Sequence, residues 1–531
     1  MNIAELFLYH APALIVALPL LGAFLTPLID KINDKLRNAF VILILGATVF
    51  FVFWLASSVL TGDPVIYVFG SQTPVDSQAA YVLNRTVIRI LFEIDALGAL
   101  MAIISSVLAL VAAIYSWSYM KENTGLGKYY TLLLLMTAGM LGMVMTGDMF
   151  NFFVFIEITS IASCALIAFW TFKQKSLEAG FKYIVISTIG ALFVLLSIAL
   201  LYGQYDALNI AKLANSMTYT FLDGLALVLL LAALAMKGGI VPMHMWLPDA
   251  YGRAPASISL VLVGATQASL YGVFRVVFTL YGRVIQLPTI SIGWIMVILG
   301  IITILVGVFM AIIQIDFKRL IAYAAVAELG FMFLAVGTGL TILVNPEFSI
   351  ANTPFALEAM KGGIFHILND ALDIGLLFLV AGAIYYATNQ TSLNKLGGMA
   401  RHMKYTTVFF VIGLLAVSGI PPMNGFASKL LIYESTFQLN PILSIIAILA
   451  SIMLLAIFVK VFYAAFLGPA QKQFETVKEV PRSMLIAMGL IAALILFIGL
   501  FPDYVVNTIV EPAAQALVNS NSYFSWLTGG V

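Results

Sequence analysis

Apolar runs of roughly 20 residues alternate with short polar segments along almost the whole chain. A helix needs about 20 apolar residues to cross the hydrocarbon core of a bilayer. This pattern predicts an all-α polytopic membrane protein with about fourteen transmembrane helices. The expected spans lie near residues 11–29, 38–60, 96–117, 129–147, 149–171, 180–203, 222–244, 256–281, 289–314, 319–343, 357–387, 405–436, 441–467 and 483–502.

Two segments are too polar to cross. Residues 61–94 contain alternating β-branched positions, so we expect an outside cap with some strand. Residues 503–531 are short and mixed, which favours an interfacial helix at the outer face. The N-terminus lacks a basic region and a small-residue cleavage site, so the first span is predicted to be retained.

The distribution of lysine and arginine predicts the orientation. If the first span runs from outside to inside, sixteen basic residues fall in inside loops and five in outside loops. Positive residues accumulate on the cytoplasmic side of membrane proteins. We therefore expect both termini outside, in a prokaryotic cytoplasmic membrane. The five outside residues would be Arg85, Arg89, Lys212, Arg283 and Lys361.

Composition excludes several classes of protein. The chain is 62% hydrophobic and 10% charged, with a mean hydropathy of +1.06, which no soluble domain of this size shows. A single cysteine, Cys164, excludes a disulfide framework and a thiolate cluster for zinc or iron–sulfur. The chain has only four histidines, which argues against haem ligation by paired histidines. We therefore expect no metal, cofactor or catalytic site in this chain.

Charged side chains nevertheless occur inside the predicted spans. Such residues are costly in hydrocarbon and usually handle ions or substrates, although any single one could be a paired or snorkelling side chain. Twelve of them spread over nine spans indicate a continuous polar track across the protein. Five are basic and fall within spans, namely Lys182, Lys237, Arg275, Lys429 and Lys460. Their acidic or histidine companions at similar depth are Asp148, Glu157, Glu328, His366, Asp370, Asp373 and Glu434.

The seventh and twelfth predicted spans carry helix-breaking residues beside a lysine. Lys237 precedes Gly238, Gly239 and Pro242, whereas Gly419, Pro421, Pro422 and Gly425 precede Lys429. Corresponding broken helices in two halves are typical of transporters built from repeats. We expect the opposite order of lysine and break to reflect an inverted repeat. The alternative reading of the first break is a plain proline kink with a lysine reaching for the interface.

Several motifs resemble one family. The segments 148–169, 237–259, 315–331, 365–382 and 419–434, together with Lys182, resemble the antiporter-like subunits of respiratory complex I. The same subunits occur in Mrp cation/proton antiporters and in membrane-bound hydrogenase complexes. The run FNFFVFIEITSIASCALIAF looks most like the Mrp D and hydrogenase-like branches.

The resemblance implies a division of the chain. Helices 1–3 would occupy residues 1–128, with the cap at 61–94. Two inverted five-helix half-channels would occupy residues 129–281 (helices 4–8) and 289–467 (helices 9–13). The last helix and its outside tail would occupy residues 468–531.

The resemblance also implies roles for single residues. Glu157 corresponds to a glutamate that modulates the seventh-span lysine, here Lys237. Lys182, His366 and Lys429 correspond to other members of the path. The expected proton or ion path is Glu157, Lys182, Lys237, Gln267, Glu328, His366, Asp370, Asp373, Lys429 and Lys460.

The chain departs from the family pattern in the middle of this path. Gln267 replaces a lysine or histidine, and Glu328 stands where a small or neutral residue is frequent. A His-Ala-x-x-Lys motif becomes Asp370-Ala-Leu-Asp373-Ile374. Three readings remain open: carboxylates carry the protons, the second half-channel prefers Na⁺, or the subunit no longer pumps and is a connector.

The expected function is therefore ion translocation, of protons or by Na⁺/H⁺ exchange, within a multi-subunit membrane complex. A redox partner or cation exchange would drive it, and any iron–sulfur, nickel–iron, flavin or quinone would belong to partner subunits. The expected partners are further antiporter-like and small multi-span subunits and the lipid bilayer, with no nucleic acid. A self-contained transporter of an organic solute and a structural scaffold remain the alternatives.

Overall fold

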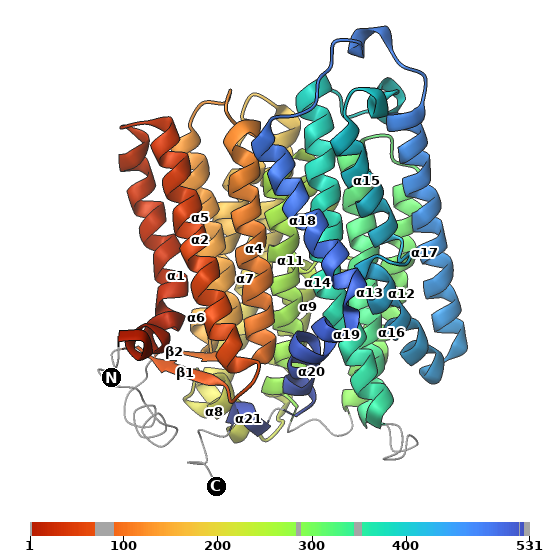
Figure 1. Cartoon of the computed structure of the whole chain (residues 1–531). Helices are drawn as coiled ribbons and strands as arrows, with labels where there is room; N and C mark the ends of the chain where they lie inside the picture. Colours follow the sequence, from red (N-terminus) through yellow and green to blue (C-terminus); the bar gives the residue numbers. More distant parts are fainter. Residues whose placement is uncertain (1–2, 70–89, 283–287, 345–352, 520, 525–531) are drawn as a thin grey trace.

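The computed structural model describes residues 3–69, 90–282, 288–344, 353–519 and 521–524. Within these residues, twelve helices are long and apolar enough to cross a membrane. Two interrupted crossings, α9 with the turns that follow it and α15 with α16, bring the total to the fourteen that the sequence predicts. The prediction of an all-α polytopic fold is confirmed, and Figure 1 shows the helices standing side by side in one bundle.

The helices and strands have the following bounds: α1 Ile3–Asp30, α2 Asp34–Val59, β1 Val65–Val68, β2 Leu91–Ile94, α4 Ala96–Tyr119, α5 Leu126–Met145, α6 Met149–Ile167, α7 Gln174–Tyr205, α8 Ile210–Ser216, α9 Phe221–Lys237, α10 Trp246–Arg253, α11 Ala256–Phe274, α12 Pro288–Ile312, α13 Phe317–Val344, α14 Thr353–Thr388, α15 Lys404–Val417, α16 Asn424–Leu439, α17 Pro441–Val461, α18 Arg482–Leu500, α19 Pro502–Val505, α20 Glu511–Val518 and α21 Asn521–Phe524. Three π-helical turns, η1 Arg275–Leu280, η5 Phe462–Leu467 and η7 Val506–Val510, and three 3₁₀ turns, η3 Leu393–Lys395, η4 Met399–Arg401 and η6 Lys472–Phe474, complete them.

The lower end of the bundle in Figure 1 carries the small elements. Strands β1 and β2 pair antiparallel there, with Val65 opposite Ile94, inside the segment predicted as a cap. Residues 70–89 of that segment lie outside the described residues. The tail forms α19, η7, α20 and α21, and Ala513, Ala514 and Leu517 of α20 are buried. Helix α1 begins at this same end (Figure 1).

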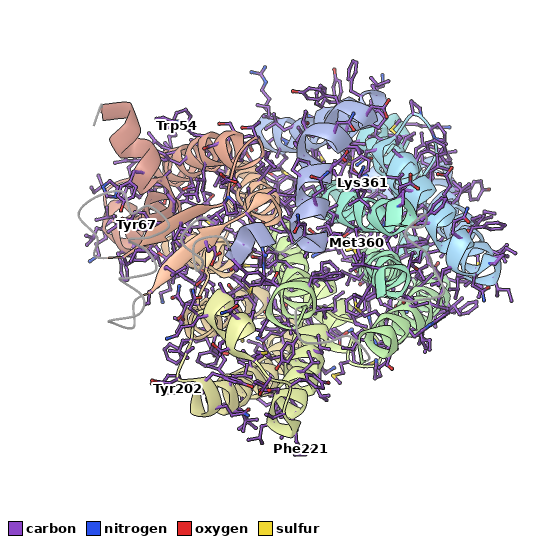
Figure 2. All side chains as sticks on the ribbon, turned by 90° about the horizontal axis from the view of Figure 1, so that it is seen from below. Trp54, Tyr67, Tyr202, Phe221, Met360 and Lys361 are labelled. Carbon is purple, nitrogen blue, oxygen red and sulfur yellow. The ribbon has the colours of Figure 1, made fainter. Side chains whose placement is uncertain are left out.

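The two halves run in opposite directions. Helix α5 descends from the upper end in Figure 1, whereas α12 ascends from the lower end. Each half then makes five crossings, α5, α6, α7, α9 and α11 in the first and α12, α13, α14, α15–α16 and α17 in the second. Seen from below in Figure 2, Tyr202 and Phe221 mark the first half, Met360 and Lys361 the second half, and Trp54 on α2 and Tyr67 on β1 the N-terminal part.

The two breaks are built alike. Gly239 and Gly419 have φ of +72° and +68°, a conformation that glycine adopts without steric cost. The amide of Ile240 donates to the carbonyl of Ala235, and that of Ile420 donates to Leu415, in each case five residues earlier. The sequence Gly-Ile-x-Pro-Met therefore ends a helix in the same way in both halves.

This geometry corrects one expectation from the sequence. An inverted repeat turns the whole unit over in the membrane without reversing its chain order, so the two breaks align directly. Lys237 then corresponds to Val417, not to Lys429, and the two lysines occupy different positions in their repeats. Lys429 nevertheless reaches its own break, because its Nζ donates to the carbonyl of Val417 at 2.7 Å.

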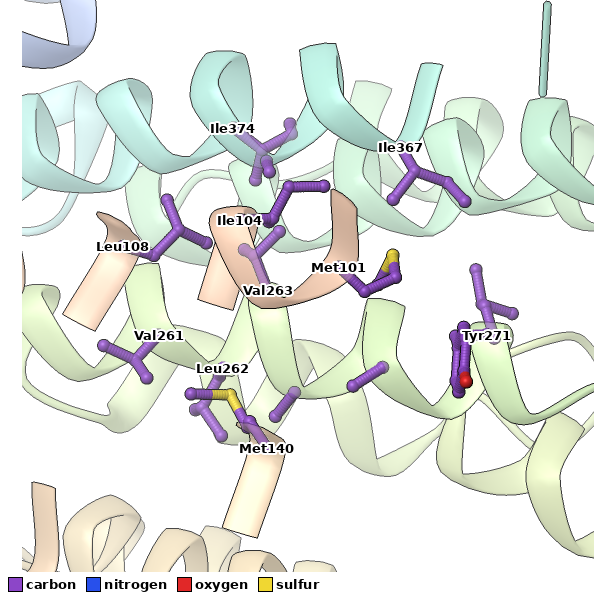
Figure 3. Close-up of a cluster of buried hydrophobic side chains, with 14 of the residues drawn as sticks. Met101, Ile104, Leu108, Met140, Val261, Leu262, Val263, Tyr271, Ile367 and Ile374 are labelled. Atoms are coloured by element: carbon purple, nitrogen blue, oxygen red, sulfur yellow. The ribbon is translucent and has the colours of Figure 1, made fainter. Parts of the chain in front are cut away.

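Helices α4, α5, α11 and α14 meet in an apolar cluster, shown in Figure 3. We call it the central apolar cluster and define it by the residues that the figure labels. The helices come together there from the N-terminal part, the first half and the second half. Its members are Met101, Ile104, Leu108, Met140, Val261, Leu262, Val263, Tyr271, Ile367 and Ile374, all buried. Ile374, which replaces a lysine of the family pattern, is thus part of the core.

Candidate functional site

The first buried centre surrounds Lys237, the last residue of α9. Its ammonium donates to Ser160 Oγ at 2.8 Å and to Ser187 Oγ at 2.7 Å, and the two hydroxyls are 2.9 Å apart. Lys237 is only 8% exposed. A cavity of about 20 Å³ adjoins it, which is room for about one water molecule. The ammonium is therefore held by neutral oxygens from α6 and α7.

Glu157 lies on α6 one turn before Ser160. Its charge acts on Lys237, but within the described residues the two side chains form no ion pair within 4.0 Å. Its Oε1 is buried and has no hydrogen-bond partner among the described residues. The expected pair of Glu157 and Lys237 is therefore not an ion pair in this structure, and Glu157 lies one helical turn from Ser160, which accepts a hydrogen bond from Lys237.

Helix α11 connects the Lys237 centre to the second half. Thr266 and Ser269 line the cavity beside Lys237, and Thr266 Oγ1 lies 2.5 Å from the hydroxyl of Tyr251. The next residue, Gln267, points across the helix interface, where its Nε2 donates to Asp370 Oδ2 at 2.8 Å. The remaining oxygens, Gln267 Oε1 and Asp370 Oδ1, are buried without a partner in the described structure.

One face of α14 carries the polar residues of the second half. His366, Asn369, Asp370 and Asp373 follow the spacing that places side chains on one side of a helix. Asn424, the first residue of α16, donates through Nδ2 to Asp373 Oδ1 at 3.0 Å and to Asn369 Oδ1 at 3.1 Å. The break before α16 thus brings an amide against the carboxylate.

The second buried centre is formed by Glu328, His366 and Lys429. Lys429 Nζ donates to Glu328 Oε1 at 2.9 Å, and the other oxygen of Glu328 lies 2.7 Å from His366 Nε2. His366 Nδ1 lies 3.1 Å from Ser428 Oγ. None of the three side chains is more than 2% exposed. Here the lysine has a carboxylate in direct contact, which the lysine of the first centre lacks.

An opening lies at the lower end of the bundle near Lys429. It has a volume of about 360 Å³, and its lining includes Glu358, Glu434 and Tyr433. Tyr433 follows Lys429 by one helical turn and donates to Ser451 Oγ at 2.6 Å. The buried centre is therefore close to a carboxylate-lined mouth.

Two predicted path residues lie away from this buried chain. Lys182 is 45% exposed and pairs with Glu178 at 2.6 Å and Asp249 at 3.0 Å. Lys460 is exposed and donates to the carbonyl of Ile312 at 3.1 Å. The structure does not join either of them to the others, because hydropathy identifies a span but not the side of the helix on which a residue lies.

Other buried polar residues escaped the sequence analysis. Ser160, Ser187, Asn369 and Asn424 complete the two centres, and single serines or asparagines in apolar helices are a weak signal for this. Arg275, predicted within a span, forms a bidentate pair with Asp95 at 2.7 and 2.8 Å, away from both centres.

Comparisons with known sequences identify the family of this chain. The sequence family described as "NADH:quinone oxidoreductase/Mrp antiporter, TM" matches residues 146–455, and "NADH-Ubiquinone oxidoreductase (complex I), chain 5 N-terminus" matches residues 83–130. NADH-quinone oxidoreductase subunit N of Desulforudis audaxviator is 30% identical over 95% of this chain and 98% of its own length. An Na(+)/H(+) antiporter subunit from Alkalihalophilus pseudofirmus is 28% identical over 94% of this chain, which spans only 62% of that relative.

A solved structure shows the same fold. A chain of the membrane-bound sulfane sulfur reductase, an archaeal respiratory membrane complex, superposes with a TM-score of 0.84 at 27% identity. The match covers 97% of this chain and 99% of that one. These similarities do not separate the branches of the family, so the preference for the Mrp D or hydrogenase-like branch stays a prediction.

Proposed function

The chain belongs to the NADH:quinone oxidoreductase/Mrp antiporter transmembrane family, and from this premise we propose that it is a proton-translocating subunit of a larger membrane complex. The observation that carries the proposal is the buried chain of charged and polar side chains from Lys237 to Lys429. Such residues persist in a membrane protein mainly where an ion or proton passes.

The Lys237 centre is suited to loading and releasing a proton. Among the described residues, its ammonium has only hydroxyl hydrogen-bond partners, and the Glu157 carboxylate forms no ion pair with it within 4.0 Å. A movement that brings Glu157 toward Lys237 favours the ammonium, and a movement that separates them favours release of the proton. Neighbouring subunits can supply such a movement without any redox chemistry in this chain.

Of the three readings of the altered second half, we favour carboxylates as proton carriers. Asp370 and Asp373 lie between the two lysine centres, and Asp370 stands at the position of the histidine in the family pattern. One oxygen of each accepts from an amide, and Asp370 Oδ1 is free of protein partners within the described structure. That free oxygen can take up a proton from a neighbouring water.

Na⁺/H⁺ exchange is the second candidate. The side-chain oxygens of Asp373 and Asn369 lie within 3.1 Å of the same nitrogen, Asn424 Nδ2, and hard cations prefer carboxylate and amide oxygens. Flux that depends on Na⁺ would favour this candidate over proton carriage alone.

We further propose that both termini lie outside and that partner subunits carry any redox cofactor. Two observations support the orientation. Helix α1 begins at the end of the bundle where α20 lies (Figure 1), and the basic residues of the loops are concentrated at the other end. Mass spectrometry of what co-purifies in mild detergent tests the partners. Iron–sulfur or quinone-module subunits would indicate a redox-driven complex, and only small multi-span partners would indicate a cation antiporter. A chain that purifies alone would contradict the subunit proposal.

The decisive variant is Lys237→Ala, with Lys460→Ala as the matched control because Lys460 lies off the buried chain. In membrane vesicles containing the assembled complex, Lys237→Ala should reduce proton flux by about tenfold or more, since a proton carrier is lost. Lys460→Ala should leave flux unchanged. Loss of assembly in Lys237→Ala would support the scaffold alternative, and normal flux would exclude Lys237 from the path.

A further inference from the structure

A second cavity lies at the upper end of the bundle, on the face opposite β1 and β2 (Figure 1). It has a volume of about 370 Å³ and lies where the connection between α6 and α7, the end of α10, the start of α13 and the end of α14 meet. We call it the basic vestibule, because Lys173, Lys175, Arg253 and Lys318 contribute to its wall. These residues come from both halves.

The vestibule carries an excess of positive charge. Among the described residues, no aspartate or glutamate lines it. One nearby carboxylate, Asp316, pairs with Arg253 at 3.2 Å. The other three cations form no ion pair within 4.0 Å in the described part of the chain. The wall also offers neutral donors, among them Gln174 and Ser176.

Lys318 is the strongest single observation. It is only 5% exposed, and its ammonium donates to the carbonyl of Ala254. A buried cation without a carboxylate in contact is costly, because the desolvation of the charge is not offset by an opposite charge. An anion in the adjoining cavity would supply that charge.

Lys173 also lines the cavity, and its ammonium is held by aromatic side chains. Its Nζ donates to the hydroxyl of Tyr385 at 2.7 Å and lies 3.7 Å from the centre of the Trp170 ring. These partners fix the ammonium without neutralising it. Two lysines and an arginine thus converge on one cavity from three elements, which suits an anion with several oxygens.

We propose that the basic vestibule binds a phosphate group and thereby links the two halves of the bundle. The phosphate belongs either to a soluble anion or to a phospholipid headgroup, since both present the same oxygens. This site plays no part in the proposed proton path, so it can be tested separately by binding.

The test uses the full chain in its detergent-solubilised complex, with inorganic phosphate as the probe and chloride at equal ionic strength as the reference. Phosphate should bind and raise the apparent melting temperature of the wild type. The double variant Lys173→Gln, Lys318→Gln should weaken binding by about tenfold or more, because two charge-assisted contacts are lost. Lys128→Gln, an exposed lysine outside the vestibule, should bind phosphate as the wild type does.

Two further arms make the result decisive. The single variant Lys173→Gln removes a half-buried lysine and should still weaken binding if the double variant does not fold. Native mass spectrometry of complexes from vesicles with and without phosphatidylglycerol identifies the source. A phospholipid retained by wild type and lost in Lys173→Gln would assign the phosphate to a headgroup. Equal phosphate effects in all variants, or no bound phosphate or phospholipid in wild type, would overturn the proposal.

Discussion

Lys237 and Lys429 are both buried lysines, but they hold their charge in different ways. Lys429 contacts the carboxylate of Glu328, whereas Lys237 contacts only Ser160 and Ser187. An ammonium held by hydroxyls depends on more distant charges for its stability, so its protonation responds to movement nearby. The charge of Lys429 is offset by direct contact with the carboxylate of Glu328. The two centres are therefore suited to different steps of one path.

Asp148, the N-cap of α6, allows a pH prediction outside the spanning helices. Burial raises the pKa of its carboxyl to about 6, although its side chain accepts from the amide of Asn151. A raised pKa in the folded state means that folding favours the protonated form. This contribution to stability is complete below about pH 3.9, the ordinary value, and is lost as the pH rises through about 6.

Asp148→Asn should remove this pH dependence and keep the cap, because an asparagine oxygen accepts the same hydrogen bond. At pH 8 the variant should be more stable than wild type by at most about 3 kcal/mol, and near pH 4 the difference should vanish. Thermal melts of the purified protein between pH 4 and 8 measure it. Asp148→Ala, which lacks the cap, is the control. Parallel melting curves for wild type and Asp148→Asn would contradict the prediction.

The limits of sequence reasoning are clearest for single lysines. From the sequence, Lys182 and Lys460 are expected on the path and Lys318 has no role, yet Lys318 is buried and the other two are exposed. Burial depends on which neighbouring helix faces the side chain, and hydropathy along one chain does not contain that information. Lys237 and Lys429 were identified because helix breaks mark them, and Asp370 and Asp373 because they are charged residues within an apolar span.

At the scale of elements, α12 and α13 approach each other unusually closely. Gly293, Gly300 and Gly307 recur every seven residues on α12. A Cβ added to Gly300 would lie 2.6 Å from the backbone nitrogen of Leu334, and one added to Gly307 would lie 2.4 Å from that of Ala327. Small residues permit such contact between membrane helices, so this stripe sets how α13 presents Glu328.

Gly300→Ile should therefore destabilise the protein by about 1–3 kcal/mol, because the backbone of α13 must move away. The apparent melting temperature in detergent measures the effect. Gly46→Ile on α2 is the matched control, since nothing lies within 4 Å of a Cβ at that position. Equal melting temperatures for the two variants would show that the helices are not held in close contact.

Most elements could be predicted, and the exceptions have a physical cause. Apolar length alone identified the fourteen crossings, and glycine and proline identified the two breaks. The span at 405–436 was predicted to be broken, and α15 ends at Val417 and α16 begins at Asn424. What the sequence did not show is how the turn between them is accommodated. Where a polar turn lies at membrane depth, its backbone is satisfied by neighbouring helices, and a single segment does not reveal those neighbours.

At the scale of the whole molecule, the two halves meet through the central apolar cluster. Ile374 belongs to that cluster, so a buried apolar side chain stands here in place of the lysine of the family pattern (Figure 3). Beside it, the hydrogen bond from Gln267 to Asp370 connects polar side chains of α11 and α14. If protons pass from the Lys237 centre to the Lys429 centre, Asp370 is the titratable group at the crossing.

Asp370→Asn tests this crossing, because an asparagine keeps the volume and an oxygen acceptor for Gln267 but cannot carry a proton at that oxygen. We expect assembled complexes with this variant to lose proton flux by about tenfold or more. Gln267→Glu is the companion variant, since it places a second carboxylate at the same crossing and should retain flux. If Asp370→Asn translocates protons as wild type does, the halves work separately, and the second half is a connector or a cation path.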